Sequence, residues 1–246
     1  MSGSFTDKDR KEIDDIIRSS SSSEAVFSDR FLGDNAGRYI FDSLKQASID
    51  GFSPKTVDCK GCYMGGESAL ALADLLKHPS CGVVSLSLEW NSIGSFESGL
   101  QEVAQGLALN TSLVTLDLRN NNVGHSGGSA LARGLRDNST LEELDLRWNE
   151  IGNSGGLAFK ELLSEGLNHA LKSVKVAGNK MTDAILTDVE GLVSGFSSQR
   201  ICLFFSNRFF FFFFFRRSSA GKLQVRSFQS LPLMSSSSYE ERTTSF

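Results

Sequence analysis

The chain has 246 residues, of which 40% are hydrophobic, so it is long enough to bury a sizeable core. Its 25 basic and 29 acidic residues give a net charge of −4, which excludes the strongly basic field typical of nucleic-acid-binding proteins. We expect a cytoplasmic protein, because the chain has only four cysteines and a polar start without an apolar signal region. We expect no membrane attachment, because no apolar run is long enough to span a bilayer.

The first 53 residues precede the regular part of the chain and divide into two segments. Residues 1–27 are predicted to be a flexible N-terminal segment with one short helix, Thr6 to Arg18, followed by a serine run, Ser19 to Ser23. Residues 28–53 carry large apolar side chains, among them Phe31 and Phe41, and are expected to form a helical cap over the open end of a repeat array.

Residues 54–195 contain a repeat of 28 to 30 residues. Three segments share the frame L-x-x-L-x-L-x-x-N-x-φ-G, where φ is apolar: VVSLSLEWNSIG (83–94), LVTLDLRNNNVG (113–124) and LEELDLRWNEIG (141–152). The frame extends to PKTVDCKGCYMG (54–65) and LKSVKVAGNKMT (171–182), which gives about five repeats. The structural frame residues at the asparagine position are Cys62, Asn91, Asn121, Asn149 and Asn179.

Each part of the frame has a physical meaning. The alternating L-x-L predicts a short strand with one buried face, and the buried asparagine amide is expected to satisfy backbone groups where the strand turns. Apolar residues at three- and four-residue spacing then predict a helix, and the recurring Gly-Gly pairs predict turns before these helices. One repeat cannot bury its own faces, so we expect an α/β leucine-rich repeat solenoid, a horseshoe with a parallel sheet on the concave face and helices on the convex face.

Residues 196–246 lack the frame and contain seven consecutive phenylalanines followed by a serine-rich end, Ser235 to Ser238. A run without amphipathic period is an aggregation hazard, so we interpret this tail as low-complexity sequence that is disordered or the product of a gene-prediction error. The alternatives are an aromatic membrane-surface anchor flanked by arginines and a segment that shields the last repeat.

The concave face is expected to hold the binding site, because the x positions of the strands line an extended surface. Aligned strands place Glu89 between Lys60 and Arg119 and bring both tryptophans into one row beside arginines, a composition typical of interface hot spots. Packing of each indole on the adjacent loop is the alternative. The residues expected to bind a protein partner are Lys60, Glu89, Trp90, Asp117, Arg119, Asn120, Asp145, Arg147, Trp148 and Lys175.

No catalytic, cofactor or metal site is expected. The strongest competing pattern is a zinc-like set, Cys59-x₂-Cys62 with His78-x₂-Cys81, but Cys59 and Cys62 occupy positions that the repeat itself requires, and a helix separates the two pairs. The chain has no glycine-rich phosphate loop, and no histidine lies beside a nucleophile in a catalytic arrangement.

The repeats resemble the ribonuclease-inhibitor class, and the stretches SLEWNSIG, LDLRNNNVGHSGG and LDLRWNEIGNSGGLAF resemble a family of centrosomal leucine-rich repeat proteins whose repeats precede a long coiled coil. The resemblance covers roughly residues 54–190. It implies a protein-binding scaffold at the centrosome, acting in centrosome cohesion and cilium assembly, with a centrosomal partner and no catalysis. Nothing after Glu190 shows heptads, so we expect the coiled coil to be absent. The alternative is a GTPase-activating protein of the Ran-regulator type, which shares the repeat class; the oligomeric state stays open.

Overall fold

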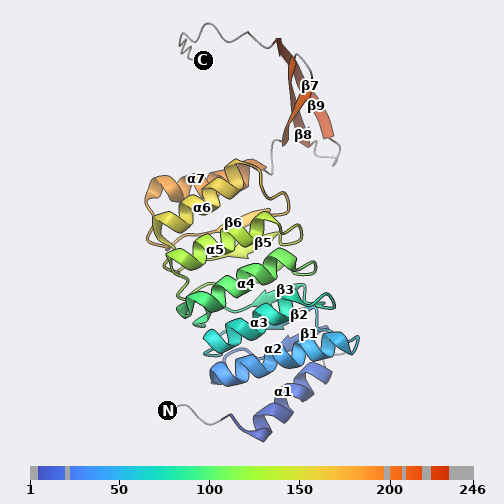
Figure 1. Cartoon of the computed structure of the whole chain (residues 1–246), viewed down its shortest axis with the longest axis vertical. Coiled ribbons are helices and arrows are strands. Elements are labelled where there is room, and N and C mark those ends of the chain that lie inside the picture. The colour runs from blue at the N-terminus through green and yellow to red at the C-terminus, as the bar shows by residue number, and fades with distance from the viewer. Residues whose placement is uncertain (1–4, 20–22, 197–199, 207–208, 218–222, 233–246) are drawn as a thin grey trace. The chain divides into compact units, whose positions relative to one another are not determined.

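The computed structural model describes residues 5–19, 23–196, 200–206, 209–217 and 223–232, and the chain divides into two units, 1–194 and 195–246 (Figure 1). In the first unit six strands form one parallel sheet in chain order. The strands are β1 (Glu24–Val26), β2 (Thr56–Asp58), β3 (Ser85–Ser87), β4 (Thr115–Asp117), β5 (Glu143–Asp145) and β6 (Ser173–Lys175). The helices are α1 (Asp7–Ser19), α2 (Gly33–Ile49), α3 (Gly66–Lys77), α4 (Glu97–Leu109), α5 (His125–Arg136), α6 (Gly152–Ser164) and α7 (Asp183–Phe196), with a 3-10 turn at Ile93–Ser95.

The core lies between the sheet and the helices. The middle residue of each strand points inward, and these residues, Val57, Leu86, Leu116, Leu144 and Val174, are paired in register and buried. Helices α2 to α6 each pack against the next and lie side by side along one face of the sheet (Figure 1). The predicted leucine-rich repeat solenoid, with a parallel sheet on one face and helices on the other, is confirmed.

The structure adds one strand to the five that the frame predicts. β1 pairs in parallel with β2, and Phe27 and Asp29 continue the pairing through hydrogen bonds from their backbone N–H groups to Asp58 and Lys60. The frame is hidden there because Arg30 occupies the position of the frame asparagine. Phe41 of α2 is buried, whereas Phe31 is 85% exposed because it lies in the loop before that helix. The serine run at 20–22 lies outside the described residues.

The Gly-Gly pairs do not all mark turns, and that prediction is wrong for two of them. Gly127 and Gly128 lie inside α5, and Gly155 and Gly156 lie inside α6. A Cβ atom on Gly127 would stand 2.3 Å from Leu100 Cδ2, and one on Gly128 2.6 Å from Ile151 Cγ2. Glycine at these positions therefore lets neighbouring units approach closely, at the cost of helix propensity.

Asp34 in the first turn of α2 caps the neighbouring helix α3. Its carboxylate accepts hydrogen bonds from the backbone N–H groups of Gly65, Glu67 and Ser68 at 2.7, 3.0 and 2.8 Å, and from Ser68 Oγ at 2.6 Å. Partial burial alone would raise the pKa of Asp34, but these hydrogen bonds outweigh it and hold the pKa below its ordinary value. The N-terminal end of α3 therefore depends on a side chain of the preceding unit.

We expect Asp34→Ala to lower the free energy of unfolding by about 1 kcal/mol at neutral pH, because α3 loses its cap. A carboxylate whose pKa is lower in the folded than in the unfolded state stabilises the fold above its unfolded pKa of about 4, and this contribution is lost as the pH falls through the folded pKa. Denaturant titrations should show the difference from wild type shrinking below about pH 4. Asp42→Ala, an exposed change on the same helix, is the control and should alter stability by less than about 0.5 kcal/mol. A pH-independent difference would contradict the capping role.

The second unit contains a three-stranded antiparallel sheet in the order β7-β8-β9. Its strands are β7 (Arg200–Ser206), β8 (Phe209–Arg217) and β9 (Leu223–Pro232), with an irregularity in the β8–β9 pairing between Phe214 and Phe215. The serine-rich segment 235–238 lies outside the described residues. None of the helices in the described ranges is long and apolar enough to cross a membrane.

Candidate protein-binding face

The sheet face opposite the helices brings the predicted binding residues into rows. The strand register aligns one such row across five strands: Asp58, Ser87, Asp117, Asp145 and Lys175. Beyond the strand ends, backbone hydrogen bonds from Trp90 to Arg119, from Asn120 to Arg147 and from Trp148 to Ala177 continue the same one-to-one alignment. Residues that lie far apart in sequence thus form a continuous surface, which we call the concave face.

A chain of ion pairs crosses the concave face. Glu89, whose side chain is only 12% exposed, lies 3.6 Å from Lys60 Nζ and 2.9 Å from Arg119 Nη2. Arg119 also contacts Asp117 at 2.6 Å and Asp145 at 3.8 Å, and Arg147 contacts Asp145 at 2.7 Å. Two aspartates on adjacent strands are tolerated because arginines neutralise them.

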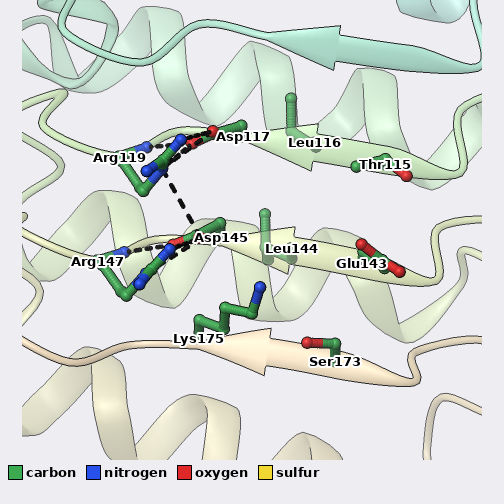
Figure 2. A pocket seen from close by; sticks show the side chains of 10 residues that line it. All are labelled: Thr115, Leu116, Asp117, Arg119, Glu143, Leu144, Asp145, Arg147, Ser173 and Lys175. Carbon is green, nitrogen blue, oxygen red and sulfur yellow. Dashed lines mark hydrogen bonds and ion pairs between the residues drawn. The ribbon is translucent and has the colours of Figure 1, made fainter.

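Hydrogen bonds strengthen both arginine pairs. The bond to Asp117 raises the pKa of Arg119, and the bond to Asp145 raises the pKa of Arg147, so both guanidinium groups stay charged. Each arginine donates through Nε and Nη2 to the aspartate two residues earlier in its own chain segment. Figure 2 shows both arginine side chains folded back towards the aspartates of their own segments.

A shallow pocket of about 230 Å³ lies over the last three strands of the sheet (Figure 2). It is lined by Thr115, Leu116, Asp117, Arg119, Glu143, Leu144, Asp145, Arg147, Ser173 and Lys175. Lys175 extends from β6 towards β5 and, unlike Arg119 and Arg147, has no ion pair within the described residues. Its side chain is exposed at the end of β6.

The two tryptophans lie at the edge of the concave face, exposed to 59% at Trp90 and 62% at Trp148. Both have a positive φ, 58° and 59°, at a position where the other units carry glycine, asparagine or aspartate. The indole of Trp148 lies over Gly178, where a Cβ atom would come within 2.6 Å of the ring. Trp148 thus packs on the adjacent loop with one side and presents the remainder of its surface to solvent.

The frame asparagines form a buried hydrogen-bond ladder between units. Asn91, Asn121, Asn149 and Asn179 are at most 6% exposed, and each donates from Nδ2 to a carbonyl of the preceding unit at 2.7 to 2.8 Å. Their Oδ1 atoms accept hydrogen bonds from backbone N–H groups of the same preceding unit. Cys62 replaces asparagine in the earliest unit of the frame and donates from Sγ to the Phe27 carbonyl at 3.0 Å.

A second asparagine ladder lies at the ends of the helices, and the frame does not predict it. Asn110, Asn138 and Asn168, each 4% exposed, donate to helix-end carbonyls of the preceding unit and accept from the N–H group three residues later. The signal is present in the sequence as the recurring N-x-x-L of NTSL, NSTL and NHAL before the strands β4 to β6. Both ladders rigidify the face that the strands present.

The zinc alternative has no support in the geometry. Burial raises the pKa of the Cys62 thiol to about 11 and that of Cys59 well above its ordinary value, so both are protonated thiols at neutral pH in this structure. In the part of the chain that the structure describes, no cluster of three or more histidine, cysteine or acidic side chains could hold a metal ion. Cys59 and Cys62 are core residues.

The parallel units of strand, asparagine turn and helix define a leucine-rich repeat solenoid. The family described as Leucine Rich repeat matches residues 109–132 and 137–160, which include β4 and β5. The chain resembles leucine-rich repeat-containing protein 45 of Gallus gallus, with 44% identity over 73 residues, a match that covers 30% of this chain and 11% of the relative's length. Among solved structures, a chain titled Leiomodin-1 Actin-Binding Site 2 (ABS2) aligns with a TM-score of 0.49 at 15% identity, covering 79% of this chain and 90% of that one.

Proposed function

We propose that this protein is a non-catalytic scaffold or adaptor that binds a protein partner through the concave face. The observation that carries the proposal is the pair of largely exposed tryptophans beside a rigid, charged surface. Exposed tryptophan and arginine are the residues that most often supply binding energy in protein interfaces. The ion-pair chain, held by two buried ladders, supplies a surface that needs little reordering on binding.

The resemblance to leucine-rich repeat-containing protein 45 supports a centrosomal partner and a place at the centrosome or cytoskeleton. Within this proposal the N-terminal helices have a structural task. Ile13 and Ile17 of α1 and Phe41 of α2 are buried, so these helices cover the apolar end of the repeat stack.

The test replaces Trp90 and Trp148 together with asparagine, which tolerates the positive φ and already occupies the equivalent position at Asn120. We expect this double variant to lose about tenfold or more in affinity for the partners that the wild type captures, because two hot-spot side chains are removed. The measurement is a quantitative pull-down with mass spectrometry, in which the lost proteins should include centrosomal ones.

The matched control is Leu109→Ala with Leu157→Ala, two exposed apolar residues on helices α4 and α6. It should recover the wild-type set, and thermal unfolding should be similar for all three proteins. Recovery of the same partners by the tryptophan variant would refute the concave face as the binding site. A sharp rise in GTP hydrolysis by a small GTPase on addition of the protein would replace this proposal with the GTPase-activating alternative.

A further inference from the structure

Two aromatic rings stack on each other in solvent in the loops that follow β1 and β2. The ring centroids of Phe31 and Tyr63 are 5.0 Å apart with an interplanar angle of 23°, and the residues are 85% and 61% exposed. We call them the aromatic rim pair. Neither appears among the expected binding residues. Adjacent large apolar side chains left this exposed are a feature of interaction sites.

The backbone holds the aromatic rim pair in place. Tyr63 has φ of 60° and follows Cys62, which is buried and hydrogen-bonded through Sγ to Phe27. The loop of Phe31 is tied to the next unit on both sides, by Asp29 N–H donating to Lys60 at 2.7 Å and Gly33 N–H donating to Cys62 at 3.0 Å. A ring platform fixed in this way loses little conformational entropy when a ligand stacks on it.

Acidic side chains that form no ion pair within the described residues lie in the same two units as the rings; Asp58 Oδ1 accepts a hydrogen bond from the Lys60 N–H at 3.0 Å. Glu24, Asp29 and Asp58 lie on the outward side of the first two units, and no ion pair joins them within the described ranges. Arg30 is paired with Glu12 and Lys60 with Glu89, whereas Lys55, directly before β2, donates its Nζ to the Gly82 carbonyl. The first two units therefore carry exposed rings together with carboxylates that no ion pair engages in the described part of the chain.

We propose that the aromatic rim pair, with Asp29 and Asp58, binds an arginine-containing basic segment of the protein partner. A guanidinium group stacks favourably on an aromatic face and pairs with carboxylates, which lysine does less well because its charge is compact and strongly hydrated. The chain makes the same kind of contact internally, with the Arg10 guanidinium carbon 4.8 Å from the Phe5 ring centroid and 4.9 Å from that of Tyr39. The proposal rests on the proposed scaffold function but assigns the partner's chemistry to different residues.

The experiment measures fluorescence anisotropy of labelled peptides that alternate glycine with arginine, lysine or glutamate, added to the full chain. We expect the arginine peptide to bind more tightly than the lysine peptide and the glutamate peptide not to bind. Phe31→Ala with Tyr63→Asn should weaken arginine-peptide binding about tenfold, and Asp29→Asn with Asp58→Asn should weaken it by a similar factor. Asparagine is used at positions 29 and 63 because both have a positive φ.

Non-specific attraction to an acidic protein is controlled by Asp137→Asn with Glu165→Asn, which removes two exposed carboxylates at the ends of α5 and α6. This variant should bind the arginine peptide as the wild type does. Equal weakening by both carboxylate pairs, or unchanged binding by the aromatic variant, would overturn the inference. The scaffold function is tested separately, by the pull-down with the Trp90 and Trp148 variant. If that variant loses partners but the aromatic variant binds the arginine peptide as the wild type does, the scaffold function stands and this inference is wrong.

Discussion

Asn149→Ala should lower the free energy of unfolding by about 3–5 kcal/mol, a large part of the stability of a typical domain. The side chain donates to the Leu118 and Leu146 carbonyls at 2.8 and 2.9 Å and accepts from Asn121 N–H and Val123 N–H at 2.9 and 3.0 Å. Alanine can make none of these bonds, and a buried backbone group left unpaired costs about 1–3 kcal/mol. Denaturant unfolding followed by circular dichroism measures the loss.

The control is Asn35→Ala, which removes an exposed asparagine from α2 and should change stability by less than about 0.5 kcal/mol. Hydrogen exchange should also show that the Asn121 and Val123 amides lose protection in Asn149→Ala before more distant amides do. A stability loss under about 1 kcal/mol would mean that water replaces the amide, and the ladder would then not be a main source of stability.

Gly134→Ala should destabilise the protein by about 2–3 kcal/mol although alanine is the better helix former. Gly134 lies in α5, where a Cβ atom would stand 2.2 Å from the Ala104 carbonyl oxygen of α4 and 2.8 Å from its carbon. The obstacle is backbone, which cannot turn away as a flexible side chain can. Helices α4 and α5 must separate to admit the methyl group, and the packing of their whole interface is weakened.

The matched control is the same substitution in an open position. A Cβ atom on Gly191 of α7 would meet nothing within 4 Å, so Gly191→Ala should be neutral or stabilise by up to about 1 kcal/mol. In thermal and denaturant unfolding, Gly134→Ala should therefore lower the free energy of unfolding, and Gly191→Ala should leave it unchanged or raise it. Stabilisation by both would show that the helices accommodate the methyl group at position 134 without strain.

The solenoid could be predicted from the sequence because the same frame recurs in each repeat. The spacing of Asn91, Asn121 and Asn149 fixes the period, and the alternating leucines fix which residues of each strand point inward. The first unit was not recognised as a repeat from the sequence, because Arg30 replaces the frame asparagine and Ala25 and Phe27 replace the frame leucines. The close approach of α5 to α4 at Gly134 could not be predicted from the sequence either, since it depends on how the two helices pack.

The rows of the concave face followed from the frame, since parallel repeats align residue by residue. What the frame does not contain is the conformation that each exposed side chain adopts beyond its backbone. Arg119 and Arg147 fold onto aspartates of their own segment, which leaves Lys175 without an ion pair in the described part of the chain. Phe31 illustrates the same limit, because its place in a loop before α2 exposes a residue whose type suggested burial.

In both asparagine ladders each side chain forms hydrogen bonds with the preceding unit. A unit is therefore completed only after the following unit has been synthesised. Asn121 completes hydrogen bonds of Leu88 and Ile93, and Asn138 completes those of Leu107 and Asn110. A unit emerging from the ribosome therefore waits for the next one before its own turn is closed. At about 5–20 residues per second that delay is on the order of a few seconds per unit, during which a nascent solenoid always ends in one open turn.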